Sequence, residues 1–177
     1  PSLHVGAQDS FSISLWVKLA NGGAGGLIKK GSNKSITLTA QKGTYGNEFP
    51  VPMPEFTLSS PIPSAATVAK GLSNLDDGKW HHIVAVRDVS EEVTIIYVDG
   101  KYVGSGSGVL HYAVDSAEPL CMGISTMPNP DGSAPATGSL NGVIDEVTIY
   151  DGMLTPKQVK TLYNDATLAV ADTNSNK

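Results

Sequence analysis

Cysteine is nearly absent from this 177-residue chain, in which Cys121 stands alone. A single thiol forms no intrachain disulfide and supplies neither a cysteine-based zinc site nor a CxxC redox pair. We expect Cys121, in the segment PLCMGI, to be a small buried hydrophobic residue. A reactive thiol or an intermolecular disulfide is the alternative.

Basic charge and long apolar runs are also scarce. Twelve Lys and Arg face seventeen Asp and Glu, the formal net charge is -5, and no basic stripe is present to neutralise a phosphate backbone. No apolar run approaches the ~20 residues that cross a bilayer, and the opening PSLHVGAQDS lacks the pattern of a signal peptide. We therefore expect a soluble protein with no nucleic-acid partner and no membrane insertion, whose export signal has been removed or lies outside this sequence.

Aromatic residues make up only 6% of the chain, whereas Gly (19) and Pro (11) are plentiful. This composition suits short strands joined by many turns. Several segments alternate apolar and polar residues and end at turn signals, which is typical of an antiparallel sandwich. The predicted strands are 11–19, 26–31, 35–41, 55–60, 81–89, 93–100, 119–125 and 142–150.

A local signal predicts one hairpin. The pair Asp99-Gly100 separates VTIIYV from KYVG. Both residues tolerate the positive φ angles of a type I′ turn, so residues 93–98 and 101–104 are predicted to pair tightly.

One helix is predicted in LTPKQVKTLYND. Thr155 occupies an N-cap position, Pro156 the first helical position, and Gln158 completes a capping box. The apolar side chains predicted to face the sandwich are Leu154, Val159 and Leu162, and those predicted to face water are Lys157 and Lys160.

Three stretches rich in Gly and Pro, 42–54, 61–66 and 125–138, are predicted to be long loops at the rim of the sandwich. The functional contacts of sandwich proteins gather on such loops. The closing segment ADTNSNK is predicted to be disordered.

The motifs also follow a specific order. Over roughly residues 10–163 the chain carries FSISLWVK, LIKKGS, LDDGKWHHIVAVRD, IIYVDGKYVGS, PLCMGIS and GSLNGVIDEVTIYDGMLTPKQVKTLY. In this order they resemble the laminin-G-like (concanavalin A-like lectin/glucanase) domains of bacterial and viral surface proteins. The resemblance implies an all-β jelly roll of two antiparallel sheets over residues 1–165, followed by a tail over 166–177. It also implies binding of sugar or protein, often with calcium.

Family members usually open with a strand of the type ALxFDGxxDYV, which has no counterpart here because the chain starts at Pro1. A missing strand would leave a sheet edge with unpaired backbone groups. The apolar segment 167–171 (TLAVA) is a candidate to fill that edge, within the chain or from a neighbouring subunit, as in strand-donating filaments.

Residues for catalysis are not evident. The glucanase relatives carry ExDxxE on one strand, which is absent, and the adjacent Asp145 and Glu146 are expected to point to opposite faces of a strand. There is no GxSxG elbow. His81 and His82 are also expected on opposite faces, one packed or hydrogen-bonded and one facing outward, with a transition-metal site as the alternative. We predict that the protein is not an enzyme.

Asp145 is the candidate metal ligand. It shares the alternation of Val143, Val147 and Ile149, which predicts a carboxylate on the core side, where it must be hydrogen-bonded, paired or metal-bound. In related folds an aspartate of the matching last-strand motif often ligates structural Ca2+, so the resemblance implies calcium as a cofactor. Hydrogen bonds from loop amides are the alternative.

Sugar binding usually needs an exposed aromatic ring beside polar groups. Trp16 and Trp80 match core positions of the family, so we expect both to be structural. The candidate ligand-binding residues lie in predicted loops or near strand ends and are Tyr45, Phe49, Tyr112, Asn129 and Asp131. Packing of the loops explains the three rings equally well, and Asp131, in NPDG, also fits a simple turn.

Two functions follow as hypotheses. The first is a non-catalytic extracellular or cell-surface module that binds glycans or surface proteins through loops 42–54 and 125–138. The second is a structural subunit of a virion or surface filament, assembled as a homo-oligomer through an unpaired sheet edge. The missing opening strand and the apolar tail favour the second, for which the expected location is a virion surface.

Overall fold

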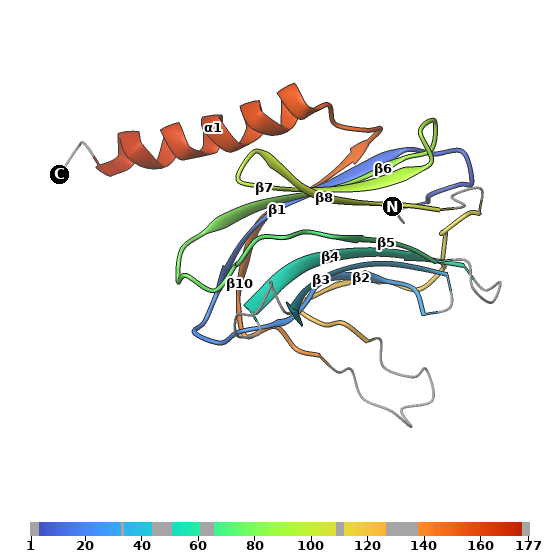
Figure 1. Ribbon diagram of the computed structural model, residues 1–177, viewed down its shortest axis with the longest axis horizontal. Helices are drawn as coiled ribbons and strands as arrows, with labels where there is room; N and C mark the ends of the chain where they lie inside the picture. Colours follow the sequence, from blue (N-terminus) through green and yellow to red (C-terminus); the bar gives the residue numbers. More distant parts are fainter. Residues whose placement is uncertain are drawn as a thin grey trace.

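The computed structural model is a sandwich of two antiparallel five-stranded sheets with a helix on its outer side (Figure 1). The structure describes residues 4–32, 34–43, 51–60, 66–108, 112–126 and 138–174, the last nine of these by their backbone alone. The predicted all-β jelly-roll class is confirmed.

The two sheets take strands from the whole chain. Sheet A consists of β1 (Phe11–Leu19), β6 (His81–Asp88), β7 (Val93–Val98), β8 (Lys101–Ser107) and β10 (Gly142–Asp151). Sheet B consists of β2 (Gly25–Lys30), β3 (Ser35–Gly43), β4 (Val51–Ser59), β5 (Ala66–Lys70) and β9 (Leu120–Met122). Their spatial orders are β10-β1-β6-β7-β8 and β5-β4-β3-β2-β9. Every predicted strand overlaps an observed one.

Aliphatic side chains fill the space between the sheets. Ile13, Leu15 and Val17 of β1 alternate along the strand, are fully buried and belong to the same core cluster as Ile36 and Leu38 of β3. Burying a side chain of this kind stabilises the fold by ~1.5–3 kcal/mol relative to leaving it exposed. The period-2 pattern of the sequence therefore corresponds directly to the core.

The turn between β7 and β8 is the pair Asp99-Gly100, as predicted. Their φ angles are 51° and 72°, and Val98 pairs with Lys101 across the turn. Positive φ at both central positions is the signature of a type I′ turn, whose twist matches that of the flanking strands.

Helix α1 (Pro156–Asn174) lies along the outer face of sheet A (Figure 1). Its capping box forms as predicted, because Gln158 Oε1 accepts a hydrogen bond from Thr155 N at 2.8 Å and Thr155 Oγ1 accepts one from Gln158 N at 3.3 Å. Val159 and Leu154 are buried against sheet A and Leu162 is half-buried, whereas both predicted solvent-facing lysines are exposed.

The helix continues past its predicted end. Residues 167–171, predicted as a strand that could fill a sheet edge, are helical, and the backbone stays helical to Asn174. The predictions of a strand and of disorder over 171–174 are therefore wrong. Ala and Leu in this segment favour a helix that is already nucleated and capped. Residues 175–177 lie outside the described part of the chain.

Two of the predicted loops are partly strands. β3 extends to Gly43 and β4 begins at Val51, so the described ends of 42–54 are paired, and Ala66, the last residue of 61–66, pairs with Ser59 as the first residue of β5. Pro52 and Pro54 fit in β4 because β5 pairs only with residues 55–59. The part of β4 that contains the two prolines therefore has no β5 residue that would need a backbone N–H from them. β5 itself was not predicted, because ATVAK is too short to carry a clear alternation.

The edges of the two sheets touch along one side, between β5 and β8. A Cβ atom at Gly104 would lie 2.0 Å from Lys70 O, and one at Gly106 would lie 2.0 Å from Val68 O. Only glycine permits this approach, which explains the glycine-rich sequence of β8.

Candidate functional site

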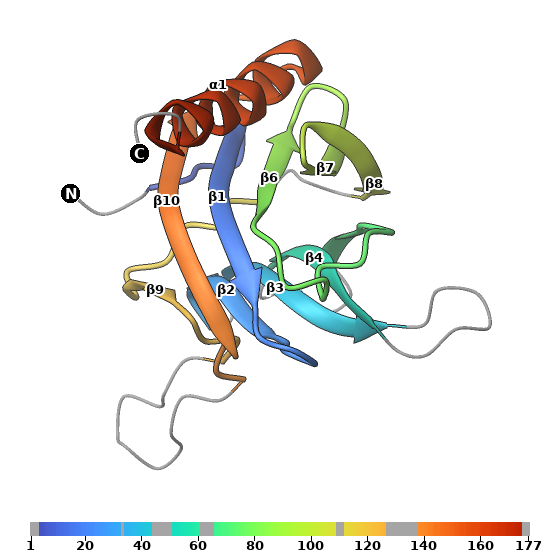
Figure 2. The ribbon, with the colours of Figure 1, turned by 90° about the vertical axis from the view of Figure 1, so that its left-hand side faces the viewer.

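Connecting segments meet at one end of the sandwich and form what we call the loop rim (Figure 2). They are the β1–β2 turn (20–24), the ends of β3 and β4 (42–43 and 51–52), the β5–β6 loop (71–80) and the flanks of the β9–β10 connection (123–126 and 138–141). Gly22 N donates to both carboxylate oxygens of Asp76, at 3.0 and 2.9 Å. Leu75 N donates to Pro52 O at 3.0 Å. The β5–β6 loop is thus tied to two other rim segments.

The two predicted ligand loops start from this rim. Asn141 N donates to Ala24 O at 3.1 Å and Gly26 N donates to Gly138 O at 2.9 Å, which fixes the β9–β10 connection beside the β1–β2 turn. Gly43 and Val51 pair at the same end of sheet B. The candidate contacts themselves, Tyr45, Phe49, Asn129 and Asp131, lie outside the described residues and stay predictions.

Trp80 is on the loop rim and not in the core. Its exposed fraction is 41%, so the prediction that it is a core residue is wrong. The reason is its position, since the strand begins one residue later, at His81, and the indole belongs to the loop. Leu72 of the same loop is also exposed. The turn signal Asp-Asp-Gly just before Trp80 is the feature of the sequence that could have indicated this.

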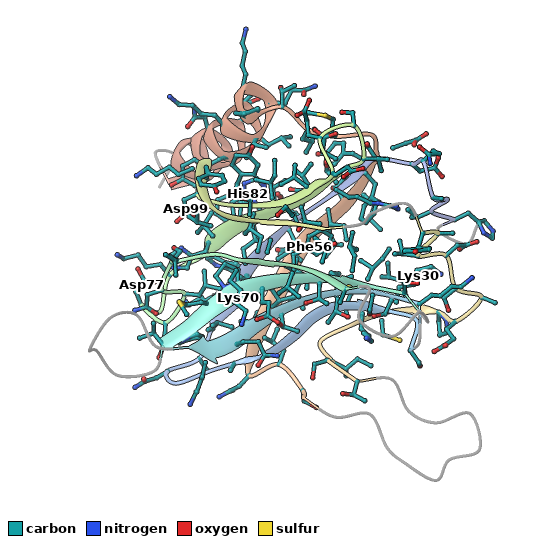
Figure 3. The ribbon with its side chains drawn as sticks, turned by 45° about the vertical axis from the view of Figure 1, so that its right-hand side comes forward. Lys30, Phe56, Lys70, Asp77, His82 and Asp99 are labelled. Atoms are coloured by element: carbon teal, nitrogen blue, oxygen red, sulfur yellow. The ribbon has the colours of Figure 1, made fainter. Side chains whose placement is uncertain are left out.

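His81 lies between two carboxylates at the rim. Its Nδ1 is 2.8 Å from Asp99 Oδ2, and its Nε2 is 3.0 Å from Asp77 Oδ1. The hydrogen bond to Asp99 is the main cause that raises the pKa of His81 above its usual 6.5, against the opposing effect of burial. Asp77 and Asp99 are labelled in Figure 3, at the end of the molecule where the rim lies.

His82 lies on the other face of β6, beneath α1. Ser14 Oγ is 2.8 Å from its Nε2, and its ring lies 5.1 Å from that of Trp16 and 6.3 Å from that of Tyr163. Burial lowers the pKa of His82 to about 4. The predicted opposite orientation of the two histidines is confirmed, but the prediction that one faces outward into solvent is wrong, since both are buried.

Trp16 is structural, as expected, although it packs outside the sandwich interior. Its ring stacks on Tyr163 of α1 at 5.9 Å. A pocket of about 320 Å³ opens beside it between α1 and sheet A, lined in part by His82, Glu146 and Tyr150. The pocket shares no residue with the loop rim.

Tyr112 is far from the rim. It is half-buried, and its carbonyl oxygen accepts a hydrogen bond from Arg87 Nη2 at 3.2 Å. Arg87 stands near the end of β6 opposite to His81, so Tyr112 lies at the other end of the sandwich from the described flanks of the two predicted ligand loops.

Asp145 does not face the core. It pairs with Trp16, is exposed, and accepts a hydrogen bond from Glu146 N at 2.8 Å. A β-bulge interrupts the pairing of β10 with β1, and Glu146 has a φ of 50°, so the core-facing residue here is Ile144. The expected core orientation is therefore wrong, and so is the regular alternation assumed for Asp145 and Glu146.

A calcium ion at Asp145 stays a prediction. Among the described residues, no three His, Cys, Asp or Glu side chains are grouped to hold a metal ion.

Cys121, on β9, was expected to be fully buried, but its side chain is only half-buried. Within the described part of the chain, no helix has the length and apolar character that crossing a bilayer requires.

Comparison with known proteins identifies the family of this chain. A sequence-family model described as the concanavalin A-like lectin/glucanases superfamily matches residues 1–160. Human neuronal pentraxin-1 is 30% identical over 104 residues, which are 59% of this chain and 24% of that protein. The chain spans less than a quarter of the length of the curated relatives that it matches first.

Solved structures show the same fold. The binding domain of Paraclostridial mosquitocidal protein 1 superposes with a TM-score of 0.67 at 16% identity, covering 92% of this chain and 38% of that one. Domain 4 of AbnA, a GH43 extracellular arabinanase from Geobacillus stearothermophilus solved with arabinotriose, gives 0.58 at 24% identity, covering 87% and 66%. The chain thus has the sandwich used by these domains.

Proposed function

We propose that this chain, which belongs to the concanavalin A-like lectin/glucanases superfamily, is a non-catalytic module that binds glycans at its loop rim. We further propose that it does so outside the cell or at the cell surface. The observation that carries the proposal is the exposed indole of Trp80, which stands on the rim from which both predicted ligand loops start.

The chemistry of the rim supports a sugar ligand. A pyranose or furanose ring packs its apolar face on an aromatic ring and needs polar groups around it for its hydroxyls. Beside Trp80, the same loop exposes Asn74, Asp77 and Lys79, which together provide donors and acceptors. A single indole with such neighbours suits a short oligosaccharide.

The relatives point the same way. The AbnA domain was solved with arabinotriose, and the mosquitocidal protein domain is described as a binding domain. Arabinotriose is therefore the first sugar to test.

The absence of catalysis is part of the proposal. A glycosidase needs two carboxyl groups about 5–10 Å apart across a cleft. Asp145 and Glu146 are adjacent, exposed and placed on β10, away from the rim segments.

A glycan array, followed by calorimetry with arabinotriose, tests the proposal. We expect Trp80→Ala to weaken binding by about tenfold or more, because a ring at the centre of a small site contributes much of the affinity. Trp80→Phe should keep most of the affinity, and Leu72→Ala, on the same exposed loop, is the matched control. Equal binding by wild type and Trp80→Ala, or no glycan bound at all, would contradict the proposal. Ordered polymers of the purified protein in electron micrographs would favour a structural subunit instead.

A further inference from the structure

Trp80 lies within a short loop whose two ends are joined by their side chains. Asp77 Oδ1 is 3.0 Å from His81 Nε2, and Gly78, with a φ of 73°, lets the chain reverse between them. The other ring nitrogen of His81 is 2.8 Å from Asp99 Oδ2, on the β7–β8 turn. His81 therefore links the Trp80 loop to a rigid hairpin of sheet A.

The contacts of His81 with Asp77 and Asp99 require an N–H donor on each ring nitrogen. A neutral imidazole has one N–H and one lone pair, whereas an imidazolium has two N–H groups. Carboxylates only accept, so Asp77 and Asp99 are both satisfied only by the charged form. We propose that protonated His81 is a positioning residue for Trp80, which holds the indole in its rim orientation and releases the Asp77 end of the loop when it loses its proton.

Asp77 is the partner that is released. Asp99 is also held by strand β6, because His82 N donates to its Oδ1 at 2.9 Å, and its bond to His81 is the shorter one, whereas the second backbone donor to Asp77, Lys79 N at 2.9 Å, belongs to the Trp80 loop itself. Asp77 stays ionised, since a hydrogen bond from Lys79 N is the main cause that lowers its pKa to about 2. When Nε2 loses its proton, a lone pair therefore faces a carboxylate.

The other groups around His81 do not replace the lost donor. Lys79 Nζ is 3.2 Å from Asp77 Oδ2, the oxygen that does not contact His81. On β1 the residue paired with His81 is Val17, which is apolar, and His82 points to the other face. The backbone of Lys160 of α1 lies beside Gly100 in the turn, and no hydrogen bond or ion pair joins it to His81. The raised pKa of His81 agrees with the charged form being the one that fits this environment.

The inference depends on the proposed function only for its effect on binding, and the test separates the two. Imidazole and indole N–H signals of the intact chain are followed by NMR from about pH 6 to about pH 9, a range in which His82 stays neutral. We expect the Trp80 signal to shift with the same midpoint as His81, while the Trp16 signal serves as an internal reference. A Trp80 signal that does not change across the His81 titration would overturn the inference, whether or not any sugar binds.

Two variants complete the experiment. Asp77→Asn should lower the His81 midpoint and remove the coupled shift of Trp80, whereas Asp76→Asn removes a charge from the same loop but keeps an acceptor for Gly22 and should change neither. Arabinotriose affinity of the wild type should fall about threefold to tenfold on crossing the His81 midpoint, as expected for the net contribution of one hydrogen bond. A coupled titration without arabinotriose binding would support the role of His81 and count against the sugar ligand.

Discussion

His81 and His82 are neighbours in β6, yet the pleat of the strand gives their imidazoles opposite chemistry. His81 meets two carboxylates at the rim, which favour its charged form, whereas His82 is buried beneath α1, which favours its neutral form. The face of the strand that a side chain occupies, and not its residue type, decides its protonation.

Acid should destabilise the protein through His82. The pKa of His82 is about 4 in the folded state and 6.5 for an ordinary histidine, so the unfolded chain binds a proton first as the pH falls. Its contribution to the free energy of unfolding is complete above about pH 6.5 and decreases toward about pH 4, by up to about 3 kcal/mol. Urea unfolding of His82→Gln, which keeps a polar partner for Ser14, should show a shallower loss in acid than the wild type. Identical acid profiles would mean that His82 does not titrate on unfolding.

The second prediction concerns Asp145. Its carboxylate is exposed and accepts a hydrogen bond from Glu146 N, which an asparagine oxygen can also accept. Asp145→Asn should therefore change the free energy of unfolding by less than about 0.5 kcal/mol. Thermal unfolding with calcium and with a chelator provides the measurement. If calcium raised the Tm of the wild type but not of Asp145→Asn, the carboxylate would be a metal ligand after all.

Interruptions of the regular strands decide which side chains reach the core and how closely the two sheets approach. The bulge in β10 moves Ile144 into the core and leaves Asp145 outside, and the glycines of β8 let two sheet edges approach each other. Both features decide side-chain placement over several residues.

The glycine contact gives the third prediction. Gly104→Ala places a Cβ 2.0 Å from Lys70 O, a backbone atom that cannot move without shifting β5. We expect a loss of about 2 kcal/mol or more in the free energy of unfolding, as for other forced overpacking. Ser107→Ala, at an exposed position of the same strand, should stay within about 0.5 kcal/mol. Equal stability of the two variants in urea unfolding would show that β5 and β8 are not in contact.

For the whole molecule, local signals predict most of the fold. The alternation in β1, the Asp99-Gly100 turn and the Thr155–Gln158 capping box each depend on a few neighbouring residues, and the structure contains all three. Features that depend on distant partners were not predictable in this way. Trp80 and Asp145 were misplaced because the start of β6 and the bulge in β10 are fixed by pairing with β1, and the far end of α1 extends where a strand was expected. For the site, the sequence indicates the rim loops but not the ring that stands on the described part of the rim.

His81 and His82 together set the pH at which the folded protein is most stable. The contribution of His81 is complete below the ordinary pKa of 6.5 and fades as the pH rises through its raised folded value, while that of His82 fades in the opposite direction. Together they give a stability optimum in near-neutral solution, which His81 limits on the alkaline side and His82 limits on the acid side. Replacing His82 should therefore reduce the loss of stability in acid, whereas replacing His81 should lower stability below about pH 6.5 and flatten the alkaline loss without raising stability there, so that two adjacent codons set the acid and alkaline limbs separately.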